Sequence, residues 1–403
     1  MFNELVHNFM RPRHFWRKVD MSELSELYAS MLLRSLALSL IGLFVPIYLY
    51  KIGYSVQSVL GYFAVFFLAR IVVDIAVAFV VGRIGPKHTL ALSTVGNIVY
   101  LAMLLSIREL HWPLPFLAVV GTITNSLFFI AFHTDFSKIK HSENGGRELG
   151  YMAILERLGG VVGPLIGGLL ATFTDPRYTI VLAITLFAAS LIPLLATNEV
   201  VKVHQVITFK GFTYKKHARH FVAYACHNTE NTASILLWTF FIALTVFKTN
   251  TYASIGAITA LGTGLSLLIA KTVGTLVDQK QGQKLLNVGV VVNSVIHLLR
   301  TFVSTPLAAL GINVMNDPVT ICYRMPFVKN FYDAADSAPG YRIVFIAVSE
   351  CISAAMRAIF WGGMFVASLY YNPIEVIKIA FYIAALLSLG IALQPRPNNN
   401  QVV

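Results

Sequence analysis

Long uninterrupted runs of apolar residues constrain this chain more than any other feature of its sequence. A helix needs about 20 mostly apolar residues to cross the roughly 30 Å hydrocarbon core of a bilayer. Runs of about this length occur at 24–50, 57–82, 88–107, 112–135, 148–174, 177–197, 219–248, 250–276, 283–304, 306–330, 341–370 and 373–394. Their apolar residues are continuous and do not alternate with polar ones, which argues against a transmembrane barrel of strands. We therefore expect an all-α polytopic membrane protein with twelve transmembrane helices.

The amino-acid composition argues against several other classes of protein. Charged residues make up 12% of the 403 residues, whereas a soluble globular protein carries about 25%. The apolar fraction of 56% is too high for intrinsic disorder, and 3 cysteines are too few for a disulfide scaffold. Twelve spans leave no room for a soluble catalytic domain, and the sequence has no nucleophile–base arrangement, metal cluster or phosphate loop. We expect neither an enzyme nor a bound cofactor.

The distribution of basic residues predicts the orientation in the membrane. One set of alternate loops holds 19 bases, while the other set holds only Lys51, Arg108, Arg177 and Lys248, with Arg300 at an edge. Loops rich in lysine and arginine stay in the cytoplasm. Both termini are therefore expected in the cytoplasm, as an even number of spans requires. The net charge of +12 follows from this asymmetry and does not indicate a nucleic-acid partner.

Weak internal repeats divide the chain into two halves. A shift of 197 residues aligns Lys87 with Lys284, and a shift of 194 aligns Glu156 with Glu350. The longest connection between spans, 198–218, is polar and basic and separates six spans from six. Two equivalent halves suit a transporter whose substrate site lies between them near the midplane. The predicted organisation is a basic segment at 1–23, a six-helix bundle at 24–197, a cytoplasmic linker at 198–218, a second six-helix bundle at 219–394 and a tail at 395–403.

A glycine-rich run marks the span at 148–174. Gly159, Gly163 and Gly167 are four residues apart and share one face of a helix, and Gly168 follows directly. Small residues on one face let two membrane helices approach closely. Pro164 removes one backbone N–H donor and can bend the helix. The run therefore predicts tight helix packing and a bend that could serve in a mechanism.

Two motifs resemble those of the major facilitator superfamily. The glycine-rich run resembles "motif C", which is typical of antiporters in that family. The loop after the span at 250–276 is similar to "motif A", with Gly274, Asp278, Gly282 and Lys284 in order and one residue inserted. The resemblance implies two helical bundles around a central cavity that opens to each side of the membrane in turn.

The first half carries a weaker copy of motif A and one departure from the family pattern. Arg83, Gly85 and Lys87 keep the basic residues and the glycine, but Gly82 stands where the family has an acid. Antiporters of the family often carry an arginine in the fourth span. The span at 112–135 has none, so proton antiport by that usual route is unsupported.

Polar and ionisable residues within the spans are the candidate substrate and coupling residues. Each ionised group costs about 2.5–3.5 kcal/mol or more at the centre of a membrane helix, so such groups normally face a cavity or a partner. Arg70 and Asp74 are four residues apart on one helix and can pair. The candidates are Arg34, Arg70, Asp74, Asn125, Glu156, Arg157, His227, Glu230, Asn231, Asn316, Asp317, Glu350 and Arg357.

Two interpretations of these residues remain open. In the first interpretation, the charges form structural ion pairs, which hold the halves together or gate the cavity. In the second, one of the carboxylates of Glu156, Glu230 and Glu350 takes up protons during transport. The polar side chains around them either contact a ligand or form hydrogen bonds between helices.

Together these features predict a secondary active transporter that moves a small molecule across the plasma membrane by alternating access. The antiporter-like run favours proton-coupled efflux. The alternatives are an importer or facilitator of a small polar nutrient, or a non-transporting receptor or scaffold on the same fold. We expect a multi-pass monomer in the inner membrane, whose partners are the bilayer, a small-molecule substrate and a proton as the coupling ion.

Overall fold

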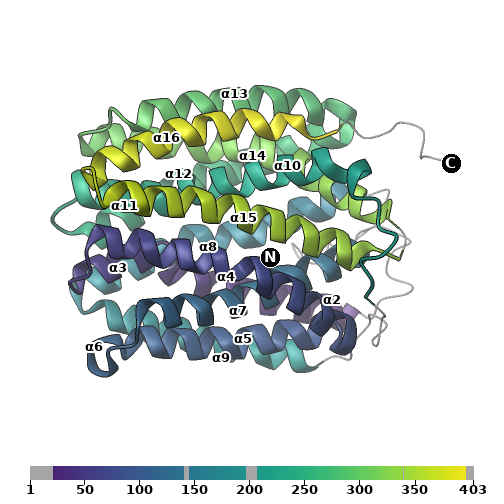
Figure 1. Ribbon diagram of the computed structural model, residues 1–403, viewed down its shortest axis with the longest axis horizontal. Helices are drawn as coiled ribbons and strands as arrows, with labels where there is room; N and C mark the ends of the chain where they lie inside the picture. The colour runs from purple at the N-terminus through teal and green to yellow at the C-terminus, as the bar shows by residue number, and fades with distance from the viewer. Residues whose placement is uncertain (1–20, 140–144, 197–206, 339, 396–403) are drawn as a thin grey trace, which may run out of the picture.

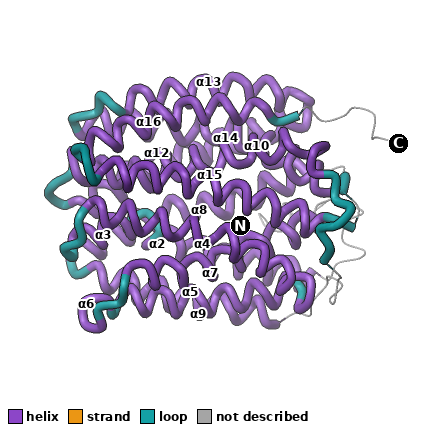
Figure 2. The backbone as a smooth tube through the Cα atoms, in the orientation of Figure 1, coloured by secondary structure: helices purple, strands orange, loops and turns teal. Residues whose placement is uncertain are grey.

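The computed structural model describes residues 21–139, 145–196, 207–338 and 340–395. Within these ranges it describes the side chains except at 21–28, 135–139, 145–153, 156, 196, 271, 278 and 280. The described chain is helical from end to end, with connections gathered at the two ends of the molecule (Figure 2). We call the end that carries the short helix α6 (Ile107–Leu110) the α6 end.

The described residues make twelve helical passes, which fall at the twelve predicted runs. The first half contains α2 (Met21–Ile41), α3 (Val45–Lys51), α4 (Val56–Ile84), α5 (Pro86–Leu105), α7 (Leu114–Ile139), α8 (Gly145–Phe173) and α9 (Pro176–Ala196). The second half contains α10 (Tyr214–Thr232), α11 (Trp238–Thr245), α12 (Thr251–Leu276), α13 (Gly282–Arg300), α14 (Pro306–Asp336), α15 (Arg342–Ser368) and α16 (Pro373–Gly390). Helices α2 and α3 form one pass, and α10 and α11 form another.

These two passes depart from a regular α-helix at one place each. Between α2 and α3 the chain makes a turn at 42–44, and Pro46 lies in the first turn of α3, where its missing N–H is not needed. Between α10 and α11 the residues Ala233–Leu237 form a π-helical segment, a feature that is frequent at functional sites. The span predicted at 24–50 is therefore interrupted by a turn, whereas the span predicted at 219–248 is one continuous helix that contains a π-helical segment.

Eight of the described passes are long and apolar enough to qualify as membrane spans by themselves. The others are α8, the α10–α11 pass, α13 and α14. The α10–α11 pass, α13 and α14 bring several buried polar residues together, among them Glu230, His297 and Asn316. Their lower hydropathy reflects these buried polar residues and, in α10, the exposed bases Lys215, Lys216 and Arg219 of its first turns.

The two halves repeat one packing pattern and lie side by side, the first below the second in Figure 1. In the first half α2 packs on α8 and α9, α7 on α4 and α5, and α5 on α9. In the second half α10 packs on α15 and α16, α14 on α12 and α13, and α13 on α16. The halves meet mainly through α4 against α15 and α8 against α12. These two contacts are equivalent, because α4 corresponds to α12 and α8 to α15 in the repeat. This pattern confirms two pseudo-symmetric six-helix bundles. The domain limits remain predictions, because 197–206 of the linker lie outside the described residues.

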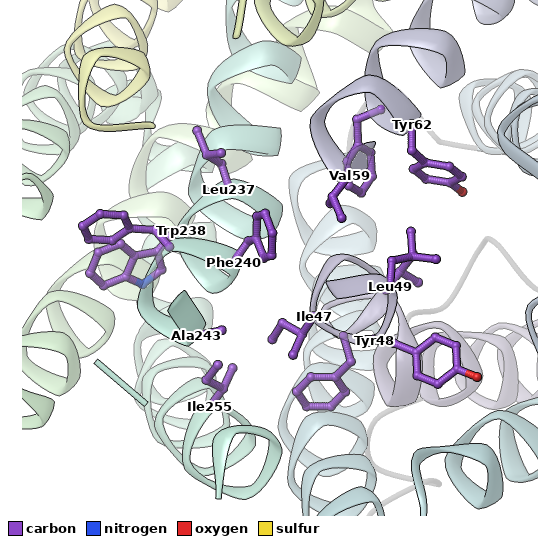
Figure 3. Close-up of a cluster of buried hydrophobic side chains, with 14 of the residues drawn as sticks. Ile47, Tyr48, Leu49, Val59, Tyr62, Leu237, Trp238, Phe240, Ala243 and Ile255 are labelled. Carbon is purple, nitrogen blue, oxygen red and sulfur yellow. The ribbon is translucent and has the colours of Figure 1, made fainter. Parts of the chain in front are cut away.

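Apolar side chains of both bundles meet at each end of the interface. At the α6 end Phe63 packs on Trp361, with ring centroids 4.6 Å apart, and α3 faces Leu237, Phe240 and Ala243 (Figure 3). Toward the opposite end Ala78 and Val81 of α4 belong to the same buried cluster as Ile343 and Val344 of α15. Along α4 and α15, the Arg70–Glu350 pair lies between these two apolar layers.

The glycine-rich run of α8 lets this helix approach α2 and α12 closely. A Cβ atom added at Gly163 would lie 2.6 Å from Ser39 Cβ, and one at Gly167 would collide with the carbonyl oxygen of Leu40. Toward the second bundle, a Cβ atom at Gly168 would collide with the carbonyl oxygen of Tyr252. The run therefore serves two interfaces, one within the first bundle and one between the bundles.

The Gly163→Leu variant should be destabilised by about 1–3 kcal/mol, because overpacking a close helix interface forces the helices apart. The measurement is the melting temperature of the detergent-solubilised protein. Gly363→Leu is the matched control, since a Cβ atom at Gly363 meets nothing within 4 Å. Equal melting temperatures for the two variants would contradict the packing role of Gly163.

Candidate functional site

A buried carboxylate, Glu350 of α15, lies at the centre of the contacts between the bundles. Its Oε2 accepts a hydrogen bond from Arg70 Nη2 of α4 at 2.9 Å, and Arg357 Nη2 lies 3.5 Å from the same oxygen. Its Oε1 accepts a hydrogen bond from the Tyr224 hydroxyl at 2.5 Å and lies 3.6 Å from His133 Nε2. Glu350 is 2% exposed. One carboxylate thus joins α4 and α7 of the first bundle to α10 and α15 of the second.

Arg70 is the partner of Glu350 in the first bundle. Its Nε donates to Asp74 Oδ2 at 3.2 Å, which is the predicted pairing along α4, and its Nη1 donates to Asn125 Oδ1 of α7. Arg70 is 1% exposed and Asp74 is fully buried. Two guanidinium groups, of Arg70 and Arg357, therefore balance the two carboxylates of Asp74 and Glu350. We call these residues, with Asn125, His133 and Tyr224, the interface cluster.

A second buried cluster lies entirely within the second bundle. Glu230 Oε1 accepts a hydrogen bond from Ser234 Oγ at 2.6 Å and lies 2.9 Å from His297 Nε2, and Glu230 Oε2 accepts one from the Tyr323 hydroxyl at 2.9 Å. Arg300 donates to Ser234 Oγ at 3.1 Å and also contacts α14 through Asn316. Glu230, His297 and Arg300 are fully buried. This bundle cluster joins α10, α13 and α14.

The first bundle holds Arg34 at the equivalent helix position. A shift of 196 residues relates Arg34 of α2 to Glu230 of α10. Arg34 donates to Thr94 Oγ1 at 2.7 Å and to Ser93 Oγ at 3.0 Å, and its guanidinium lies 4.0 Å from the centre of the Phe128 ring. No described carboxylate pairs with it. The two bundles therefore bury charges of opposite sign at equivalent positions.

The remaining candidates are distributed as follows. Arg157 of α8 donates to Ser266 of α12, and Asp317 Oδ2 of α14 accepts a hydrogen bond from Thr263 of α12 at 2.9 Å. These contacts flank the interface between α8 and α12. His227 packs edge-on against the ring of Tyr323, with ring centroids 6.0 Å apart, and its Nδ1 has no hydrogen-bond partner among the described residues. The side chain of Glu156 lies outside the described residues.

The motif A positions occupy one end of the molecule, opposite α6. Gly85 has φ +85° and ends α4 immediately before Pro86 begins α5, a tight connection that requires a glycine. Gly274 lies in α12, and Gly282 begins α13 with helical dihedral angles after a π-helical segment at Val277–Gln281. Arg83 and Lys284 are exposed, Lys87 is half-buried, and the side chain of Asp278 lies outside the described residues.

The candidate list missed several members of the two clusters. Tyr224 and Tyr323 donate to Glu350 and Glu230, but the chain has 17 tyrosines and no spacing distinguishes these two. His297 and Arg300 lie near the end of a span, where charges are common. His133, the one ionisable residue in the apolar part of α7, is the member that could have been chosen from sequence. Among the described residues, no group of three or more histidine, cysteine, aspartate or glutamate side chains could hold a metal ion.

Twelve passes in two equivalent bundles, with ionised groups sequestered between and within them, define the class of polytopic secondary transporters. The family profile of the Major Facilitator Superfamily matches residues 27–342. The chain belongs to this superfamily. No curated protein matches the sequence.

Solved structures share the fold at low sequence identity. The human organic anion transporter MFSD10 is 12% identical, with a TM-score of 0.68 over 93% of this chain and 99% of that chain. The E. coli fucose:proton symporter FucP is 13% identical, with a TM-score of 0.63 over 91% of this chain and 96% of that chain. A second FucP structure, in the outward conformation, is 12% identical, with a TM-score of 0.63 over 92% and 98% of the two chains.

Removing the central arginine should destabilise the protein. Arg70→Met leaves Asp74 and Glu350 buried without their main partner, and breaking a buried ion pair on one side costs about 3–5 kcal/mol. Lys284→Met, which removes an exposed charge, is the control. We expect a clear loss of melting temperature in Arg70→Met alone. Arg70→Lys should restore little, because an ammonium group cannot reproduce the planar fork that reaches three acceptors. Equal melting of Arg70→Met and the control would contradict this role.

Proposed function

We propose that the protein is a proton-coupled exporter, in which efflux of a small molecule is exchanged for protons. The observation that carries this proposal is the position of Glu350, buried between the bundles and held by groups from both. A coupling carboxylate must change its surroundings when the bundles move. Glu350 meets this requirement, since Arg70 and His133 belong to the first bundle while Tyr224 and Arg357 belong to the second.

Movement of the bundles links the charge of Glu350 to the conformation. With Arg70 and Arg357 in contact, the ionised carboxylate is stabilised by opposite charge and by hydrogen bonds. Separation of α4 from α15 would remove Arg70, and a carboxylate left in poorly hydrated surroundings takes up a proton. A proton bound at Glu350 in turn weakens the contact with Arg70 and favours separation. Each step can thus drive the other, as alternating access requires.

The direction of transport is proposed from α8. Its glycine–proline run resembles the antiporter motif, and it is packed between α2 and α12, so a bend at Pro164 would act on both bundles at once. The usual arginine of the fourth span is missing here, and α7 instead contributes Asn125 and His133 to the interface cluster. We propose that Arg70 and Glu350 take over the coupling role. FucP, a fucose:proton symporter, has the same fold, so the fold serves symport as well.

The proposed setting is a bacterial plasma membrane, with both termini in the cytoplasm and the α6 end outside. The substrate would bind between the bundles at the level of the interface cluster, where Asn125 and Asp317 offer polar contacts. The protein would act as a monomer and use a proton as its coupling ion.

Transport in liposomes tests this proposal. Purified protein is reconstituted with an imposed pH gradient, and proton flux is recorded with an enclosed pH-sensitive dye while a panel of dyes, sugars and amino acids is added. We expect at least one compound to release protons down the gradient through the wild-type protein. Glu350→Gln should lose about 90% or more of this coupled flux, since it cannot carry the proton.

The control is Glu375→Gln, which removes an exposed carboxylate whose one ion pair among the described residues is with Lys378, at 2.8 Å. This variant should keep the wild-type flux. Proton flux that is unchanged in Glu350→Gln would overturn the coupling role. Accumulation of the compound together with protons, and not against them, would support the importer in place of the exporter.

A further inference from the structure

A cavity opens between the two bundles at the α6 end. Its volume is about 270 Å³, and its lining includes Tyr48 and Lys51 of α3, the start of α9, and Lys248 and Tyr252 beside the start of α12. This volume corresponds to roughly nine water molecules, enough for a small organic molecule. The cavity shares no residue with the interface cluster.

All four bases of the connecting segments at this end line the same cavity. They are Lys51, Arg108, Arg177 and Lys248, and they come from four different connections. This end of the molecule is the one poor in basic residues, as the charge count of the loops shows. Random placement would not bring every one of a few scattered bases to a single cavity. Their convergence indicates a negatively charged occupant.

The described residues do not balance the positive charge of this cavity. Arg177 pairs with Glu109 at 3.1 Å and with Asp175, which also lines the cavity, at 3.5 Å. Lys51, Arg108 and Lys248 have no ion pair with any described residue. The first turns of α9 and α12 also reach the cavity, and helix N-termini carry partial positive charge.

Two buried hydroxyls in the cavity wall have no hydrogen-bond partner. Tyr48 is 3% exposed and Tyr252 is 8% exposed, and neither hydroxyl forms a hydrogen bond with the described residues. Both tyrosines line the cavity together with Arg108 and Asp175. A buried hydroxyl without a partner costs free energy. An oxygen of a bound anion would satisfy one or both, since an O–H group donates to it.

We propose that this cavity binds a small anion, a carboxylate or phosphate compound, held by Lys51, Arg108, Lys248 and the hydroxyls of Tyr48 and Tyr252. Because Tyr48, Lys51 and Arg108 belong to the first bundle and Lys248 and Tyr252 to the second, a bound anion joins the bundles at the α6 end. The site goes beyond the proposed function and does not depend on proton coupling. The phosphate of an anionic lipid headgroup has the same chemistry as a soluble anion, so both sources are tested.

The experiment uses the full chain in nanodiscs made of phosphatidylcholine. Citrate and inorganic phosphate are titrated calorimetrically, and triethyl citrate, which lacks the charges, is the matched neutral probe. In a second arm the nanodiscs contain phosphatidylglycerol and no added anion, and the melting temperature is measured. We expect citrate, phosphate or phosphatidylglycerol to bind or to stabilise, and triethyl citrate to have no effect.

Variants connect the binding to this cavity. Arg108→Gln and Lys248→Gln should each weaken binding about two- to fivefold, and the double variant about tenfold, as expected for exposed charge pairs. The double variant Tyr48→Phe/Tyr252→Phe should weaken binding without changing the charge. Lys284→Gln, an exposed base at the opposite end, should bind as the wild type does. The melting temperature of each variant without anion shows that it is folded.

Each result either supports or overturns the proposed anion site. Binding of citrate or phosphate that weakens in the cavity variants supports the site with a soluble anion as its occupant. Stabilisation by phosphatidylglycerol alone, lost in the same variants, supports it with a lipid headgroup. The proposal is overturned if no probe acts on the wild type, if triethyl citrate binds equally, or if Lys284→Gln loses binding as much as the cavity variants.

Discussion

The cost of an ionised group in hydrocarbon governs this structure. The charged side chains of the two clusters are buried in protein. Glu350 is enclosed by Arg70, Arg357 and Tyr224, and Glu230 by His297 and its hydroxyl donors. Such charges do more than add stability, because a buried ion pair contributes little net free energy when it replaces well-packed apolar groups. Their main effect is on conformational change, because a buried charge is left without compensation when its partner moves away.

The two bundles share one arrangement of six helices but differ in the polar residues that they bury. The same set of helix contacts occurs twice, and the two main interfaces, α4 with α15 and α8 with α12, exchange under the repeat. The polar contents differ. The first bundle surrounds Arg34 with hydroxyls and an aromatic ring, whereas the second surrounds Glu230 with a histidine, a tyrosine and an arginine-linked serine. The symmetric frame thus carries charges of opposite sign at equivalent positions.

The described conformation is closed by apolar layers at both ends of the bundle interface, with the interface cluster between them. Two features lie at positions from which they can act on this state. The glycine-rich run of α8 brings backbones together on both of its sides, so a small change in its bend is transmitted to α2 and α12. The basic cavity at the α6 end contains residues of both bundles, so an occupant there would favour the closed arrangement of that end. Binding energy at a bundle interface can only shift the equilibrium to the extent that it differs between the two states.

The sequence by itself determined the number of passes, their approximate limits and the pairing of Arg70 with Asp74, since hydropathy and four-residue spacing are local properties. The family resemblance, carried by the glycine run of α8 and the loop glycines, gave the two-bundle fold. Only the tertiary structure decided which charges meet. Glu350 and Arg70 are 280 residues apart, Tyr224 is one of many tyrosines, and the four bases of the cavity come from four separate connections. Hydrocarbon favours a partner for each buried charge, but the sequence does not show which residue that partner is. The packing of the helices determines which charged groups meet.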